Sequence, residues 1–103
     1  MNILWSDQAA AAFWAIRDDI FNRFGIEAEN EFVEDADKTI KQVAAHPNIG
    51  TPEYELSSEG DVQSILVHKL SRIVYYFEGD NMYIADVWAT RQDPHNLISR
   101  FQK

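Results

Sequence analysis

The chain has 103 residues and a formal net charge of −8, and 46% of its residues are hydrophobic. A chain of this length and composition can bury a real core, so we expect residues 1–103 to form a single domain. The absence of cysteine excludes disulfides, thiolate catalysis and cysteine-bound zinc. The sequence shows neither an apolar run that could cross a membrane nor a secretory leader pattern, so we expect a cytoplasmic protein with no membrane partner.

The negative charge is concentrated in the first half of the chain. Residues 1–59 hold four Lys/Arg against twelve Asp/Glu, whereas residues 60–103 hold five of each. Six of the acids lie between Glu27 and Asp37 with no cation among them. This run is typical of the solvated face of a helix, and a docking surface for a basic partner segment is the alternative. Because phosphate binding depends on Lys/Arg, we expect no direct binding to free nucleic acid.

The first half of the sequence predicts a short strand followed by two helices. Residues 2–5 are an apolar stretch typical of a strand, and Ser6 can cap the helix that follows. Apolar residues spaced by three and four predict a first helix to about Phe24, where Gly25 supplies the stop. A second helix with its own apolar stripe ends before Pro47, because the residue before proline avoids helical geometry. The two stripes are Phe13, Ile16, Ile20 and Phe24, and Phe32, Val33, Ala36, Ile40, Val43 and Ala44.

The second half predicts a loop and then strands. Residues 47–60 are rich in Pro, Asn, Gly, Thr and Ser, which is typical of a connection. Three β-rich runs follow at 62–67, 72–77 and 82–89, and the short turns between them force antiparallel pairing. Asp93 can cap a short C-terminal helix with Pro94 at its first position. We therefore predict an α+β fold: an N-terminal strand, a helical hairpin packed on a mainly antiparallel sheet, and a short C-terminal helix.

The alternation of side chains in residues 72–77 separates the two faces of the predicted sheet. One face carries Ile73, Tyr75 and Phe77 and suits the core, which leaves Arg72 and Tyr76 on the face away from the helices. That open face is the expected binding surface, because it lies in the half of the protein without excess negative charge. On it we predict three partner-binding residues, namely Tyr76, Ile84 and Trp88, with Ile84 and Trp88 sharing the face.

The sequence does not predict a metal or a cofactor. The three histidines, His46, His68 and His95, are far apart, and no His-Glu-x-x-His or similar spacing is present. There is also no glycine-rich phosphate loop and no arrangement of Ser, His and Asp that indicates nucleophilic catalysis.

Several stretches together resemble a known family. The order of elements, the stretch RIVYYFEGDNMYI at 72–84 and the closing TRQDP at 90–94 are similar to the RelE/ParE superfamily of toxins from bacterial type II toxin-antitoxin modules. The HPNIG at 46–50 resembles the Pro-x-x-Gly with which the second helix of that family ends. The resemblance spans nearly the whole chain and is closer to the ParE, or plasmid-stabilisation, branch. It implies a growth-inhibiting toxin that a cognate antitoxin neutralises.

The resemblance implies two alternative mechanisms. ParE-like members poison DNA gyrase through contacts that are not known to be catalytic, and RelE-like members are ribosome-dependent mRNA endonucleases. The RelE-like enzymes use lysines on the second strand, an arginine at the start of the third, an arginine at the end of the fourth, and a tyrosine in the C-terminal tail. Such a nuclease needs several cations and a titratable group close together.

The match to the nuclease is partial. Arg72 and Arg91 match the two arginines, and His95 could replace a proton carrier because the ordinary pKa of histidine lies near neutrality. These three residues are the candidate catalytic set. However, residues 61–67 contain no lysine, residues 92–103 contain no tyrosine, and the chain is acidic. We therefore favour the ParE-like poison of gyrase, with the RelE-like nuclease acting on the ribosome and an inactive antitoxin-binding relative as alternatives.

Overall fold

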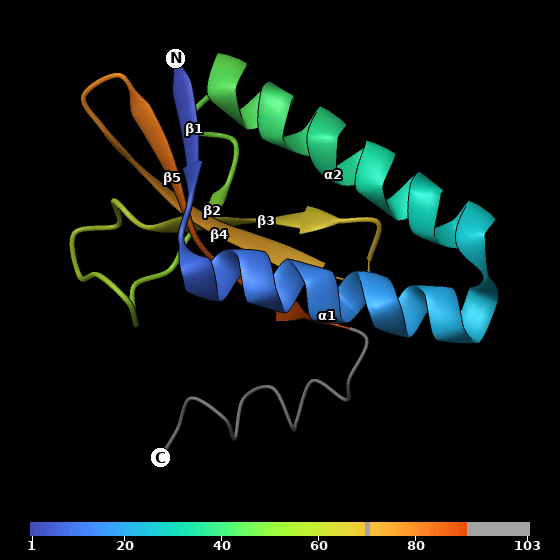
Figure 1. Ribbon diagram of the computed structural model, residues 1–103. Helices are drawn as coiled ribbons and strands as arrows, with labels where there is room; N and C mark the ends of the chain where they lie inside the picture. Colours follow the sequence, from blue (N-terminus) through green and yellow to red (C-terminus); the bar gives the residue numbers. More distant parts are fainter. Residues whose placement is uncertain (70, 91–103) are drawn as a thin grey trace.

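The computed structural model describes residues 1–69 and 71–90 and shows two helices covering one face of a five-stranded sheet (Figure 1). The strand order is β1-β5-β4-β3-β2, with β1 parallel to β5 and all other neighbours antiparallel. In chain order the elements are β1 (Asn2–Trp5), α1 (Asp7–Phe24), α2 (Ile26–Ala45), β2 (Thr51–Pro52), β3 (Gln63–Val67), β4 (Ser71–Glu78) and β5 (Asn81–Ala89). The predicted α+β fold is confirmed, while the predicted C-terminal helix at Asp93 lies outside the described residues.

The helical hairpin begins and turns where the sequence predicts. The Ser6 hydroxyl accepts a hydrogen bond from the Ala9 N–H over 2.9 Å, which satisfies one of the free amides at the start of α1. The same hydroxyl donates to the carbonyl oxygen of Ala85 on β5 over 2.9 Å, so the cap also fastens α1 to the sheet. Gly25 ends α1 and begins α2 with a φ of 95°, a conformation that favours glycine.

The core lies between the hairpin and the sheet, and α2 buries the apolar stripe that the sequence predicts. From the sheet, Ile73 and Tyr75 of β4 are fully buried and Phe77 packs against them, as the alternation of β4 predicts. Phe24 is an exception, because it lies beside the turn at the tip of the hairpin, where its side chain is 64% exposed. No helix within the described parts of the chain is long and apolar enough to span a membrane.

The predicted connection at 47–60 contains the short strand β2, which pairs with β3 at the edge of the sheet. The next two strands match the predicted runs within a residue or so at either end. His68 and Lys69 turn the chain from β3 into β4 with φ values of 53° and 61°. Two successive residues in the left-handed region follow the twist of the two antiparallel strands.

A β-bulge in β5 overturns one prediction about the sheet faces. Asp86 and Ile84 lie opposite neighbouring residues of β4, so Ala85 between them is an extra residue in the ladder. Because the bulge shifts the alternation by one residue, Ile84 faces the helices and Trp88 faces away. Ile84 is fully buried within the core. The prediction that Ile84 shares the open face with Trp88, and is available to a partner there, is therefore wrong.

Candidate functional site

Arg72 lies on the sheet face away from the helices and is held by the neighbouring strand. Its Nε donates to the Ser64 hydroxyl of β3 over 2.8 Å, and its Nη2 lies 3.5 Å from the Ser64 carbonyl oxygen. Ser64 is fully buried, and its hydroxyl donates to Glu53 Oε2 over 2.5 Å. These three residues form what we call the Arg72 cluster, in which one hydroxyl separates a carboxylate from the guanidinium.

The Arg72 cluster has a clear electrostatic consequence. The carboxylate of Glu53 offsets part of the charge of Arg72, and it would repel a phosphate that approached the guanidinium. On the five strands that the structure describes, Arg72 is the only cation. The cluster therefore connects the 53–61 loop with β3 and β4, but it does not provide the several cations that RNA cleavage requires.

Tyr76 and Trp88, the two other predicted binding residues on this face, are both half-buried. Tyr76 stacks on Tyr83 with ring centroids 5.1 Å apart. Trp88 lies opposite Arg72 in the strand register, and its indole N–H donates to Asp86 over 3.2 Å. The structure thus places Arg72, Tyr76 and Trp88 on one surface, which we call the open sheet face.

The two remaining candidates follow the last strand. Arg91 and His95 lie outside the described residues, as do all residues from 91 to 103. Their closeness to Arg72 therefore stays a prediction.

Tyr75 and Gly50 are a pair that sequence reasoning did not single out as interacting. The Tyr75 hydroxyl donates to Gln63 Oε1 over 3.0 Å and also has a backbone hydrogen bond with Gly50. Burial raises the pKa of Tyr75 above its ordinary value. A Cβ atom at position 50 would collide with the Tyr75 hydroxyl and lie 2.9 Å from the Ser64 carbonyl oxygen. The glycine of the Pro-x-x-Gly segment is thus explained by close packing.

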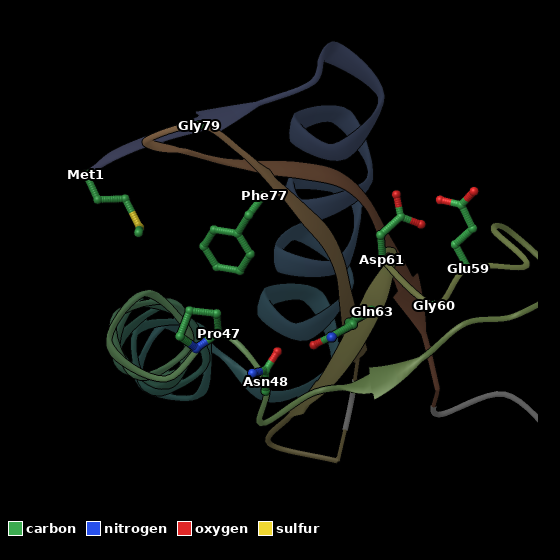
Figure 2. A pocket seen from close by; sticks show the side chains of 9 residues that line it. All are labelled: Met1, Pro47, Asn48, Glu59, Gly60, Asp61, Gln63, Phe77 and Gly79. Carbon is green, nitrogen blue, oxygen red and sulfur yellow. The ribbon is translucent and has the colours of Figure 1, made fainter.

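A hollow of about 460 Å³ lies between the start of β1 and the loops next to β3 (Figure 2). Met1 and Phe77 point toward each other across it, while Glu59 and Asp61 lie at its other end. Among the described residues, no lysine, arginine or histidine side chain lines this hollow. Its lining side chains therefore offer no cation that could stabilise a phosphate or another anion.

A second hollow, of about 310 Å³, opens between β1, α1 and α2 and has a mainly apolar lining. We call it the interhelical hollow. Ile3 and Trp5 line it from β1, Phe13 from α1, and Val33 and Asp37 from α2. Beside it, Ile3 and Leu4 of β1 are exposed, so an edge strand and an apolar hollow are available together. This combination suits a protein segment better than a small polar substrate.

The comparisons with known proteins agree with this geometry. A solved structure titled "Chromosomal ParDE TA system from P. aeruginosa" superposes with a TM-score of 0.69 at 21% identity, covering 87% of this chain and 96% of that one. A "YoeB/ParE toxin from Agrobacterium tumefaciens" superposes with a TM-score of 0.58 at 16% identity, covering 86% of this chain and 98% of that one. At these identities the likeness concerns the fold. No curated protein matches the sequence significantly.

The sequence profile of the family described as "ParE toxin of type II toxin-antitoxin system, parDE" matches residues 3–94. The match extends from β1 across the hairpin and the whole sheet. Membership of this family implies a cognate antitoxin as a partner. The chain therefore belongs to the ParE branch of the RelE/ParE superfamily and is the toxin component of a type II toxin-antitoxin system.

Proposed function

We propose that this toxin arrests bacterial growth in the cytoplasm by binding and poisoning DNA gyrase, without cleaving RNA, and that its cognate antitoxin neutralises it. The observation that carries the proposal is the Arg72 cluster. Arg72, the only cation on the described strands, is already engaged by Ser64 and lies one hydroxyl away from Glu53. This supports a contact residue rather than a catalytic one.

RNA cleavage makes demands that the described residues do not meet. The reaction must deprotonate a 2′-hydroxyl, neutralise the charge on the phosphorane and protonate the leaving oxygen. β3 carries no lysine that could help with any of these steps. The net charge of −8 also opposes entry into a ribosomal site that is surrounded by RNA phosphate. These features favour a toxin whose target is a protein.

The open sheet face has the side chains that protein interfaces favour. Tyr76 and Tyr83 form a stacked aromatic pair, and Trp88 and Arg72 lie opposite each other on neighbouring strands. Tyr, Trp and Arg supply most of the binding energy in many protein interfaces, because each combines a large apolar area with a polar group. We therefore assign the contact with gyrase to this face, and we expect Arg91, which follows β5 in the sequence, to take part in it.

The test uses purified toxin with purified gyrase, and separately with translating ribosomes. We expect the toxin to inhibit supercoiling and to accumulate cleaved DNA in the presence of gyrase, while mRNA on ribosomes stays intact. Cleavage of ribosomal mRNA without any effect on gyrase would replace this proposal with the nuclease alternative. If neither assay responds and expression of the protein does not slow growth, the chain is an inactive relative.

The contact surface is tested with variants of the same toxin. Tyr76→Ala and Arg91→Ala should each weaken the inhibition of gyrase at least tenfold. Tyr54→Ala is the matched control, because Tyr54 is an exposed tyrosine of the 53–61 loop, outside the strands of the sheet. If toxicity in cells survives both Arg72→Ala and Arg91→Ala, the assignment of these two arginines fails whichever target is correct.

If the antitoxin binds the toxin and leaves the open sheet face free, it must use a second surface of the toxin. The interhelical hollow provides apolar contacts, and Asp37 of the acidic helix α2 is among the residues that line it. These properties support an antitoxin segment that is amphipathic and basic. The open sheet face remains the other candidate docking surface for this segment.

A further inference from the structure

We propose that Glu31, Asp35 and His68 form a binding site for a divalent transition-metal ion of the Zn²⁺ type. We call it the α2–turn site. The fold brings together a histidine and two carboxylates that lie more than thirty residues apart in the sequence. The site is separate from the Arg72 cluster, and the inference does not depend on whether the toxin acts on gyrase.

The two elements that meet here fix the three side chains near one another. Glu31 and Asp35 are four residues apart on α2, so both carboxylates project from the same face of the helix. His68 lies in the short turn between β3 and β4. Its Nδ1 lies 2.8 Å from Asp35 Oδ2, and its Nε2 lies 3.9 Å from Glu31 Oε1. One ligand atom from each residue lies within 4.8 Å of the others.

The distances leave a small adjustment before an ion could be bound. Zinc binds imidazole nitrogen and carboxylate oxygen at about 2.0–2.2 Å, which places neighbouring ligands of a tetrahedral site roughly 3.4 Å apart. A single ion binds only one nitrogen of the imidazole ring, so with Nδ1 as the ligand its 2.8 Å distance to Asp35 Oδ2 must lengthen, whereas the distances to Glu31 must shorten. Rotation of side chains can supply both changes, because the side chain of Glu31 is 64% exposed.

The donor atoms select the class of ion. An imidazole with two carboxylates suits zinc and its first-row neighbours, whereas magnesium and calcium prefer oxygen ligands alone. Three protein ligands leave the fourth position of a tetrahedral ion to water. The ligands Glu31 and Asp35 belong to the acidic run of α2 from Glu27 to Asp37, whose negative potential raises the local concentration of cations. The acidic run of α2 would then serve to attract and bind the ion.

A bound ion would fasten the β3–β4 turn to α2. In the absence of metal the link consists of the contact between His68 and Asp35 and the longer one to Glu31. An ion that binds the folded chain but not the unfolded chain stabilises the fold by an amount that grows with the logarithm of its concentration relative to its Kd. The expected effect is a metal-dependent increase in the melting temperature of the toxin.

The experiment titrates chelator-treated, full-length toxin with ZnCl2 in a calorimeter and follows the melting temperature in parallel. We expect one ion per chain. The variants Glu31→Gln and His68→Ala should each weaken binding at least tenfold and abolish most of the shift in melting temperature. The matched controls are Glu34→Gln, an exposed acid of the same helix, and His46→Ala, which removes an exposed histidine outside the site. They should change the affinity by less than twofold.

Two results would overturn the proposal. One is the absence of zinc binding to the wild-type toxin at micromolar concentrations. The other is equal loss of affinity in the controls and in the site variants, which would indicate non-specific binding to exposed side chains. Circular dichroism verifies that each variant is folded, and the side-chain NMR signals of His68 should shift with zinc even if the variants bind poorly for another reason.

Discussion

At the scale of single residues, the path of the loop after α2 depends on the close approach of Gly50 to the Tyr75 hydroxyl. The φ of Gly50 does not lie in the positive, left-handed region, so the backbone conformation does not require a glycine there. The requirement is space, because the hydroxyl of Tyr75 occupies the position of a side chain at residue 50. The loop is thus closed over a core tyrosine whose hydroxyl also needs its hydrogen bonds to Gln63 and Gly50.

We predict that Gly50→Ala destabilises the protein by about 1–3 kcal/mol, the usual cost of adding a methyl group to a well-packed site. Denaturant unfolding measures the change. In a Tyr75→Phe background the same substitution should cost less, because the colliding oxygen has been removed. An equal cost of Gly50→Ala in both backgrounds would show that the hydroxyl is not the obstacle.

The pKa of Tyr75 predicts how stability depends on alkaline pH. Burial raises this pKa above the ordinary value of 10.0, because the charged phenolate is poorly solvated in the core. The folded chain therefore keeps a proton that the unfolded chain loses. The contribution to stability is fully present below pH 10.0 and decreases as the pH rises above it. Unfolding in urea at a series of alkaline pH values should show this loss, and Tyr75→Phe should make the decline shallower.

At the scale of elements, the periodicity of apolar residues predicts the long and regular helices and strands. The helical hairpin and the three-stranded meander follow from apolar spacings of three to four and of two. β2 is missed because two residues cannot show an alternation. The bulge at Ala85 is missed because nothing in the sequence of β5 marks an extra residue, and it turns Ile84 toward the helices while Trp88 stays on the open sheet face. The register of a strand depends on its partners as well as on its own residues.

The bulge leads to a prediction about Ile84. Because Ile84 is fully buried, Ile84→Ala should cost about 2–5 kcal/mol of stability through a cavity in the core. Ile49→Ala is the matched control, since Ile49 is 48% exposed in the loop and should change stability by no more than about 0.5 kcal/mol. Similar losses in the two variants would place Ile84 on the surface and contradict the bulge.

The candidate sites show the same limit of sequence reasoning. Arg72 and Tyr76 could be placed on one face from alternation within a single strand. Neither Glu53 beside Arg72 nor Asp35 beside His68 could be found in this way, because each pair joins elements that come together only in the tertiary structure. Long-range contacts of this kind depend on the packing of α2 and of the 53–61 loop against the sheet.

At the scale of the whole molecule, charge is divided between two parts of the fold. Residues 1–59 carry the entire excess of negative charge, whereas the sequence from residue 60 onward is balanced. The interhelical hollow lies in the acidic part, and the open sheet face lies largely in the balanced part. This small protein can therefore bind two partners of different charge, one at each of these surfaces.

This division predicts that the antitoxin binds through a basic segment and that salt weakens the encounter. Opposite charges accelerate association at low ionic strength, and salt screens them over about 10 Å at 0.1 M. The association rate should fall at least tenfold between about 0.05 and 0.5 M NaCl. Stopped-flow or surface-based kinetics with the purified antitoxin measures this dependence.

Charge reversals distinguish local attraction from the effect of net charge. Glu34→Lys on α2 should slow association and make it less sensitive to salt, whereas Asp80→Lys in the β4–β5 turn adds the same charge in the balanced part and should have little effect. Equal effects of the two reversals would mean that only net charge matters. An antitoxin whose toxin-binding segment is acidic would remove the electrostatic basis for docking at α2, and only the apolar contacts of the interhelical hollow would remain to attract it.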